Sequence, residues 1–174
     1  MLKRSMLALT LVLIMLAMAS PSAAQPAVFL VRHAERADSA PGTSPTMGAD
    51  PDLSEAGRTR AESLATLLRD ANITAIFATE FKRTQQTAAP LARALGLTVK
   101  VIPSKSTADL VKQVEATKGN ALVVGHSNSV PDVVKALGIS MPVTIGDDDF
   151  DNLFIVNRGV NRGTAASLLR LHYR

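Results

Sequence analysis

The ten residues "AVFLVRHAER", Ala27 to Arg36, indicate both a fold and a place for chemistry. The first half is a short apolar run bounded by polar residues, which is typical of a strand buried on both faces of a sheet. The second half, Arg32-His33-Ala34-Glu35-Arg36, gathers ionisable groups. Because ligands of open parallel sheets bind outside the carboxyl ends of the strands, we expect a polar site at the tip of this strand.

Strand and helix patterns alternate along the rest of the chain. Ser54 is a good N-cap, and Ala61, Leu64, Ala65 and Leu68 follow it at the spacing of one helix face. By the same criteria we predict further strands at residues 75–78, 97–102, 121–124, 153–156 and 166–171, and helices at 54–70, 79–96, 107–116 and 130–137.

This alternation predicts an α/β three-layer sandwich with a mostly parallel central sheet, and 174 residues leave room for one domain. Pro90 is expected to kink or split the helix at 79–96, and Gly96 is its candidate C-cap. The last two strands are expected to form a hairpin around "NRGVNRG", residues 157–163. Residues 37–53 are rich in Pro, Gly, Ser and Asp and predict a long loop, a feature that is usually functional or mobile.

Residues 1–24 have the pattern of a secretory signal peptide. Lys3 and Arg4 form a positive start, the apolar stretch from Met6 to Ala19 is too short to span a bilayer, and small residues precede a cleavage point before Gln25. We therefore expect a mature domain, 25–174, that is periplasmic or secreted and has no stable membrane anchor. An uncleaved anchor is the alternative.

The composition argues against several classes of protein. Charged residues make up 20% and apolar residues 47% of the chain, a balance typical of a globular protein. The chain has no Cys, which excludes disulfides, thiolate metal sites and lipoprotein anchoring. Two of the charges behind the net +4 are Lys3 and Arg4, so the remainder carries only +2. This weak charge, without a basic stripe interleaved with aromatics, does not fit nucleic-acid binding.

Cationic and nucleophilic side chains stand at the ends of three predicted strands. His33 and His126 each follow a buried run, and Arg83 lies where the strand at 75–78 leads into a helix. Guanidinium groups match phosphate oxygens, helix N-termini favour anions, and a neutral imidazole can act as a nucleophile. Together, Arg32, His33, Arg83 and His126 predict a site for a phosphoryl group.

Each of these residues also has an ordinary structural interpretation. A His after a strand is commonly a satisfied turn residue, and Arg83 by itself would be a solvated residue at a helix start. His172, near the C-terminus, is interpreted as structural. The order and spacing of the segments are what favour a site.

Four motifs in the right order resemble the histidine phosphatase superfamily, whose fold is phosphoglycerate-mutase-like. The motifs are "VRHAE" (31–35) for the family's Arg-His-Gly, "LSEAGRTRAE" (53–62) for its Leu-Thr-x-x-Gly, "ATEFKRTQQTA" (78–88) for its strand ending in Ser before Arg and Thr-Ala, and "LVVGHSNSV" (122–130) for its final Gly-His. Ala34 replaces Gly, and Thr79 replaces Ser. The resemblance covers most of residues 27–137. Within the family, the chain is similar to the short-chain members that lack a large cap over the site.

The resemblance implies a metal-independent phosphatase that needs no cofactor. His33 would attack phosphorus and carry a phosphohistidine, which water then hydrolyses. Arg32, Arg83 and His126 would bind the phosphoryl oxygens and stabilise the charge of the transition state. The partner would be a small phosphorylated substrate or a phosphoprotein.

The carboxylic acid that protonates the leaving group in the family is not obvious in this sequence. Ser127 occupies the position that is acidic in one branch, and the segment 96–107, which corresponds to the other branch's insertion, contains no acid. Glu35, Asp109 and the run 147–151 are candidates, and the ordinary structural interpretation of that run is an exposed acidic turn. Without an acid, phosphoramidates and aryl phosphates, which have good leaving groups, are favoured substrates.

Alternative functions stay open at this stage. Residues 36–40 contain no Asn, unlike the family's mutases, so a phosphoglycerate mutase fits poorly. A phosphate- or phosphorylated-ligand-binding module of the same fold, with little turnover, is the main alternative to a phosphatase. A zinc site built from the two rim histidines and carboxylates is a third, although no H-E-x-x-H spacing is present.

Overall fold

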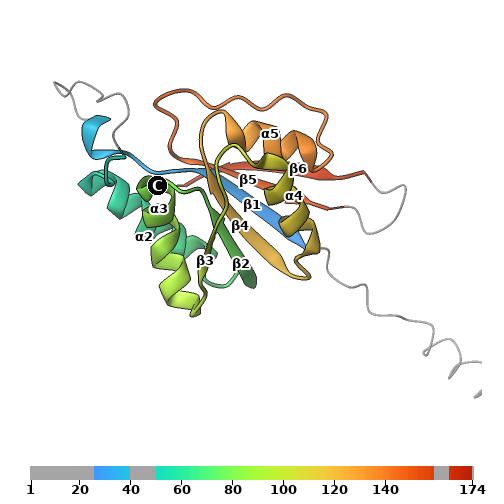
Figure 1. The fold of residues 1–174 in the computed structure, drawn as a ribbon, viewed down its shortest axis with the longest axis horizontal. Helices are drawn as coiled ribbons and strands as arrows, with labels where there is room; N and C mark the ends of the chain where they lie inside the picture. Colours follow the sequence, from blue (N-terminus) through green and yellow to red (C-terminus); the bar gives the residue numbers. More distant parts are fainter. Residues whose placement is uncertain (1–25, 40–49, 159–164, 174) are drawn as a thin grey trace, which may run out of the picture.

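Six strands form one sheet in the order β3-β2-β4-β1-β5-β6. The computed structural model describes residues 26–39, 50–158 and 165–173 (Figure 1). The strands are β1 (Ala27–Arg32), β2 (Ile73–Ala78), β3 (Val99–Val101), β4 (Asn120–Gly125), β5 (Asn152–Asn157) and β6 (Ser167–His172). The predicted strands are all present, although β2 begins two residues before the predicted start and β3 is shorter than predicted.

The sheet is parallel from β3 through β2 and β4 to β1, and then antiparallel through β5 and β6. Val124 of β4 pairs with Val31 of β1 on one side and with Ala78 of β2 on the other. The carboxyl ends of these three strands therefore finish at the same level. We call this edge the rim, and it is where the sequence predicts the site.

Helices cover both faces of the sheet, as Figure 1 shows. The helices α2 (Glu55–Leu68) and α3 (Lys82–Leu95) lie on one face, and α4 (Thr107–Ala116) and α5 (Ser129–Ala136) lie on the other. This arrangement is the α/β three-layer sandwich that the alternating pattern predicts. A short 3₁₀ helix, η1 (Ala37–Ser39), follows β1.

The helix ends follow from local chemistry. The Ser54 hydroxyl accepts a hydrogen bond from the Gly57 N–H, which caps the start of α2. Gly96 ends α3 with a φ of 64°, a left-handed conformation that favours glycine. Pro90 lies inside α3, which continues through it, so the alternative of a split helix is wrong.

The core is almost wholly aliphatic and is divided by the sheet into two layers. Val28 and Leu30 of β1 pack with the α4–α5 layer, while Phe29 and Val31 pack with the α2–α3 layer. All four side chains are buried, which confirms that β1 is covered on both faces. We expect Leu30→Ala to cost about 2–5 kcal/mol of stability, so β1 is a rigid support for the residues that follow it.

The described ends of the long loop at 37–53 are tied together by an isolated antiparallel bridge between Arg36 and Leu53. The middle of this loop, residues 40–49, lies outside the described residues, as do the predicted signal peptide (1–24) and most of the turn between β5 and β6. In the described part of the chain, no helix is long and apolar enough to cross a membrane.

Candidate functional site

The two strand-end histidines lie side by side at the rim. Arg32 pairs with Gly125 across β1 and β4, and the backbone N–H of His33 donates to the Gly125 carbonyl at 2.9 Å. This extends the parallel pairing by one residue beyond the strand. As a result the ring centroids of His33 and His126 are only 5.4 Å apart.

His33 is held in one tautomer by the backbone. Its Nδ1 lies 2.8 Å from the carbonyl oxygen of Ala34, and because a carbonyl can only accept, Nδ1 carries the proton. The lone pair of the neutral ring is therefore on Nε2. Burial lowers the pKa of His33 to about 3; the Ala34 hydrogen bond opposes this shift, and His126 and the nearby arginines add to it. At neutral pH the ring is uncharged, as a nucleophile must be.

His126 is positioned by the first residue of α5 and by the hydroxyl of the residue that follows β2. Its backbone N–H donates to the Ser129 Oγ at 2.9 Å, and its Nε2 lies 3.0 Å from the Thr79 Oγ1. A Cβ at position 125 would lie 2.9 Å from the same Ser129 oxygen, which explains the glycine before this histidine. Burial, followed by Arg83, lowers the pKa of His126 to about 4, so this ring is also neutral at neutral pH.

Two arginines flank the histidines, and each is stacked on a phenylalanine ring. The guanidinium carbon of Arg32 lies 4.2 Å from the ring centroid of Phe150, and that of Arg83 lies 4.2 Å from that of Phe81. Burial lowers the pKa of both arginines, with smaller contributions from neighbouring charges, but guanidinium stays charged at any relevant pH. Stacking on an aromatic face restrains the planar group without neutralising it.

Four rings form a continuous row between the arginines. Phe150 lies 6.1 Å from His33, His33 lies 5.4 Å from His126, and His126 lies 5.3 Å from Phe81, centroid to centroid. The site thus consists of two similar halves, each with one arginine, one phenylalanine and one histidine. We call Arg32, His33 and Phe150 the β1 half, and Phe81, Arg83 and His126 the β2–β4 half.

The phenylalanines are the residues of the site that the sequence did not reveal. The chain has only five Phe, and two of them stack on the site arginines. Phe81 directly precedes α3, and its position between a strand end and Arg83 is a signal that could have been used. Phe150 lies in the acidic run before β5, and nothing short-range in the sequence connects it with Arg32.

Both arginines keep a buried donor that no described group satisfies. Among the described residues, the buried side-chain nitrogens without a hydrogen-bond partner include the Nε of Arg32 and the Nε of Arg83. A buried donor left unpaired costs about 1–3 kcal/mol. Two such donors on cationic groups that flank a pair of histidines suit a bound oxyanion, which could accept from both.

The two arginines differ in how their outer nitrogens are used. The Nη1 of Arg32 donates to the carbonyl oxygens of Gly146 and Asp147, both at 2.7 Å. The Nη1 of Arg83 lies 3.6 Å from a carboxylate oxygen of Asp50, an ion pair without a hydrogen bond. Arg32 therefore also anchors the loop before β5, whereas Arg83 is held mainly by its ring contact.

Two motif residues hold the rim together rather than face it. The Thr87 hydroxyl accepts from the Ala34 N–H at 3.0 Å and donates to the Arg83 carbonyl at 2.7 Å, so it links the end of β1 to α3. A Cβ at Gly57 would lie 2.2 Å from the carbonyl oxygen of Glu35, so only glycine allows α2 to approach this closely. These contacts connect the motif at residues 31–35 to the motif at 78–88 through Thr87 and to the motif at 53–62 through Gly57.

The structure does not bring the candidate proton donors to the histidines. Both carboxylate oxygens of Glu35 accept from Arg60, at 2.6–3.0 Å. Asp109 lines a separate groove beside α4, with Ile102, Pro103 and others. The assignment of either residue as the acid therefore gains no support from the geometry.

Two other carboxylates near the rim, those of Asp149 and Glu80, are engaged in hydrogen bonds. The carboxylate of Asp149 accepts from the Gly146 N–H. Glu80 accepts from the N–H and the hydroxyl of Ser104; burial alone would raise the pKa of Glu80, but these and other hydrogen bonds lower it below its usual range. Glu80 is therefore a charged group that ties the β3–α4 loop to the end of β2, not a ready proton donor.

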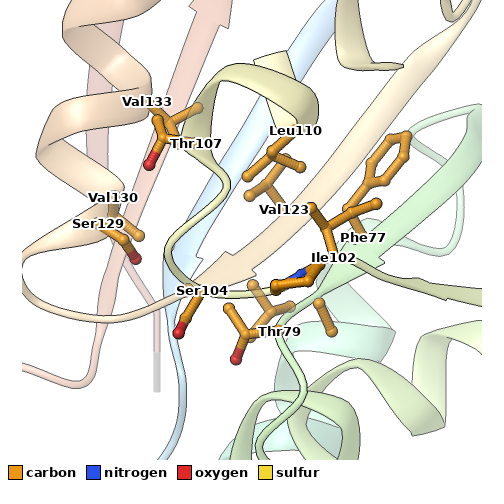
Figure 2. Close-up of a pocket in the computed structure, with 14 residues that line it drawn as sticks. Phe77, Thr79, Ile102, Ser104, Thr107, Leu110, Val123, Ser129, Val130 and Val133 are labelled. Carbon is orange, nitrogen blue, oxygen red and sulfur yellow. The ribbon is translucent and has the colours of Figure 1, made fainter. Parts of the chain in front are cut away.

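A narrow hollow of about 370 Å³, its open mouth included, lies behind the β2–β4 half. Figure 2 shows the hydroxyls of Thr79, Ser104 and Ser129 toward one end of it, with Phe77 and Val123 among the apolar side chains behind them. Thr79 lines the hollow and also contacts His126. The side of Thr79 that faces away from His126 is therefore next to the apolar side chains of the hollow.

Neither a third histidine nor a metal cluster joins the site. His172 is exposed at the end of β6, and its Nδ1 lies 3.1 Å from a carboxylate oxygen of Asp151. Within residues 26–39, 50–158 and 165–173, no group of three or more His, Asp and Glu side chains is placed to hold a metal ion.

Comparison with known proteins agrees with this architecture. Residues 28–105 match the model of the histidine phosphatase superfamily (branch 1). No curated protein sequence matches the chain significantly. Many solved structures share its fold, three of which are described next.

The protein histidine phosphatase SixA complexed with tungstate is 18% identical, with 84% of this chain and 96% of that chain covered and a TM-score of 0.64. The mycobacterial glucosyl-3-phosphoglycerate phosphatase complexed with VO₃ is 17% identical, with 83% and 97% covered and a TM-score of 0.64. A candidate α-ribazole-5′-P phosphatase from Escherichia coli is 18% identical, with 85% and 96% covered and a TM-score of 0.67. The matches cover 83–85% of this chain, and its described residues show no large cap beyond the common fold.

Proposed function

We propose that the chain is a metal-independent phosphatase of the histidine phosphatase superfamily, whose model matches residues 28–105, and that the rim is its active site. The observation that carries the proposal is the state of His33. Its ring is neutral, its Nδ1 is bound to a carbonyl, its Nε2 keeps the lone pair, and two arginines with unpaired buried donors stand on either side. A nucleophile between two cationic oxyanion binders suits phosphoryl transfer better than any other reaction.

The proposed reaction has two displacements at phosphorus. The Nε2 of His33 attacks, the bond from phosphorus to the leaving atom breaks, and His33 carries a phosphohistidine. Water then attacks phosphorus, the P–N bond breaks, and His33 is regenerated with release of inorganic phosphate. Arg32, Arg83 and His126 contact the phosphoryl oxygens, and the guanidinium groups stabilise the charge that these oxygens carry in both transition states.

The proposed substrates are phosphoramidates and phosphomonoesters with good leaving groups, on a small molecule or a phosphoprotein. Glu35 is bound by Arg60 and Asp109 lies in another groove, so no carboxylic acid is assigned to protonate a poor leaving group. A missing acid costs about 10²–10⁴ in rate for poor leaving groups and less for good ones. Solved structures with a similar fold include a protein histidine phosphatase and a glucosyl-3-phosphoglycerate phosphatase, which supports either class.

The test is hydrolysis of p-nitrophenyl phosphate in the presence of EDTA by the wild type and His33→Ala. A matched control is His172→Ala, which removes an exposed histidine away from the rim. Activity that survives EDTA, is abolished in His33→Ala and is kept in His172→Ala supports a metal-independent histidine phosphatase. Activity lost with EDTA, or kept in His33→Ala, contradicts the proposal.

A binding module with little turnover is the second candidate, and the unpaired arginine donors favour it equally. Binding needs only positive charge and donors. We therefore expect a pure binder to keep its affinity for inorganic phosphate in His33→Ala, as measured by isothermal titration, and to show no hydrolysis in the wild type. Loss of turnover in His33→Ala with unchanged phosphate affinity instead identifies His33 as the nucleophile of an enzyme.

We also propose that the protein is exported and acts in the periplasm or outside the cell. The support is the sequence of residues 1–24, with its positive start, short apolar stretch and small residues before Gln25. Mass spectrometry of the protein from the periplasmic fraction of an expressing bacterium tests this. A mature N-terminus at Gln25 supports export with cleavage, whereas an intact Met1 in the cytoplasm contradicts it.

A further inference from the structure

Two buried threonine hydroxyls connect His126 to the backbone of the β2–α3 turn. Thr84 is fully buried and Thr79 is 6% exposed. The Thr79 Oγ1 lies 3.0 Å from the Nε2 of His126 and 2.9 Å from the Thr84 Oγ1. Either atom of each pair could be the donor, so the direction of this chain has to be worked out from the groups at its far end.

The far end of the chain consists of acceptors only. The Thr84 Oγ1 lies 2.8 Å from the carbonyl oxygen of Phe81 and 3.1 Å from that of Thr79. A hydroxyl has one proton, and a carbonyl cannot donate, so the proton of Thr84 goes to these carbonyls. The reverse arrangement would leave two oxygens 2.8 Å apart without a hydrogen between them.

The remaining protons then follow in order. The Thr84 oxygen must accept from Thr79, so the single proton of Thr79 is used there. The Thr79 oxygen must in turn accept from His126, so the Nε2 of His126 carries a hydrogen. Neutral His126 therefore has its lone pair on Nδ1, which has no hydrogen-bond partner among the described residues and is not among the buried unpaired atoms.

We infer that Thr79, oriented by Thr84, is a positioning residue that keeps the proton of neutral His126 on Nε2 and presents the Nδ1 lone pair to the phosphoryl group. The inference deepens the proposed function and rests on it for the identity of the ligand. It assigns the two histidines opposite tautomers, because His33 carries its proton on Nδ1 and presents Nε2.

A consequence for binding follows from this tautomer. A lone pair on Nδ1 repels a fully deprotonated phosphoryl oxygen, so a favourable contact needs a proton either on Nδ1 or on the phosphoryl group. The charged and titratable groups around His126 are Arg83 from α3, Glu80 from the end of β2, and Arg32 and His33 from β1. Burial, followed by Arg83, keeps the free imidazole neutral, so we expect phosphate dianion to bind together with one proton.

The tautomer can be tested without any activity measurement. Nitrogen-15 NMR of the labelled wild type, with the His172 signals assigned from His172→Gln, distinguishes protonated from unprotonated ring nitrogens. At about pH 8, where both rim histidines are neutral, we expect His126 to show a protonated Nε2 and His33 a protonated Nδ1. A protonated Nδ1 on neutral His126 overturns the inference, whatever the enzyme does.

Variants then test whether Thr79 is the cause. In Thr79→Val, which keeps the shape but removes the hydroxyl, we expect a mixture of His126 tautomers, and in Thr79→Ser we expect the wild-type tautomer. An unchanged tautomer in Thr79→Val contradicts the positioning role. If Thr79→Val does not fold, Thr84→Val removes the acceptor of the Thr79 proton and should allow the same mixture.

Calorimetric titration with inorganic phosphate, in buffers of different ionisation enthalpy, counts the protons taken up on binding. We expect close to one proton per phosphate dianion in the wild type and in Thr79→Ser, and clearly less in Thr79→Val. Equal uptake in all three contradicts the inference. If the wild type has the expected tautomer and proton uptake but no hydrolysis, the positioning role stands and the proposed phosphatase activity fails.

Discussion

The two halves of the rim contain the same three residue types, but they are held by different means. The β1 half is held by the backbone: Ala34 fixes the His33 ring, and two carbonyls anchor Arg32. The β2–β4 half is held by side chains: the Thr79 hydroxyl contacts His126, and the Phe81 ring and Asp50 restrain Arg83. Substitution cannot remove a backbone acceptor, so the half with the nucleophile is the more constrained.

The largest expected effect separates the two histidines. We expect His33→Gln to abolish turnover, with a loss of at least about 10⁴, because the nucleophile is gone. His126→Gln should lose about 10²–10³, because it removes one group that contacts the phosphoryl oxygens. Steady-state hydrolysis of p-nitrophenyl phosphate measures both losses.

Mass spectrometry after quenching in alkali, where phosphohistidine survives, sharpens this comparison. The His126→Gln protein should still form a phosphorylated species, and the His33→Gln protein should form none. Phosphorylation of His33→Gln, or equal rate losses in the two variants, would show that the nucleophile has been assigned to the wrong half.

The arginines provide the next comparison. In Arg32→Lys and Arg83→Lys we expect kcat/KM to fall about 10²–10³-fold, since an ammonium group does not reproduce the planar donor fork. Only Arg32→Lys should also destabilise the protein, by about 1–3 kcal/mol, because it loses two hydrogen bonds to the loop before β5. Urea unfolding of both variants tests this, and an equal loss of stability would mean that the loop is not anchored through Arg32.

A smaller effect concerns pH. The pKa of His33 is lowered to about 3 and that of His126 to about 4, and an unfolded chain has histidine pKa values of about 6.5. Below pH 6.5 the unfolded state therefore binds more protons than the folded state, and stability falls as pH falls. This contribution is complete above about pH 6.5 and is lost progressively toward pH 4 for His126 and pH 3 for His33.

Urea unfolding of the wild type across this range should show the loss, and the double variant His33→Gln/His126→Gln should show a flatter dependence on pH. The variant His172→Gln serves as the control, because His172 is exposed and lies away from the rim. An identical pH dependence in the wild type and the double variant would contradict the burial of the two rings as neutral groups.

The same contrast explains how far the sequence alone could be interpreted. Short-range patterns were sufficient for the strands, the helices and the four rim residues. Arg32 ends β1 and His33 follows it, Arg83 lies in the first turn of α3, and His126 directly follows β4. Parallel strands bring their ends to one edge, so the order of the chain predicted proximity. The β2–β4 half even carries its own Phe81 two residues from Arg83.

Long-range contacts could not be obtained in this way. Phe150 reaches Arg32 across more than a hundred residues, through a loop whose course no periodicity predicts. The pairing of Glu35 with Arg60 could not be predicted either, and it engages the candidate acid that is nearest to the nucleophile in the sequence. In both cases the partner is chosen by packing of loops and helices against the rim, and not by local propensity.

The smallest expected effect lies in the two phenylalanines. Loss of a stacked ring should cost about 0.5–1 kcal/mol, or roughly two- to five-fold in KM, where the arginine has no other restraint. Phe81→Leu should show this full effect, because among the described residues Arg83 otherwise has only an ion pair at 3.6 Å. Phe150→Leu should change KM less than two-fold, since two carbonyls at 2.7 Å still hold Arg32 in place. If Phe150→Leu raises KM more than Phe81→Leu does, the ring rather than the backbone positions Arg32, and the two halves are held in the same way.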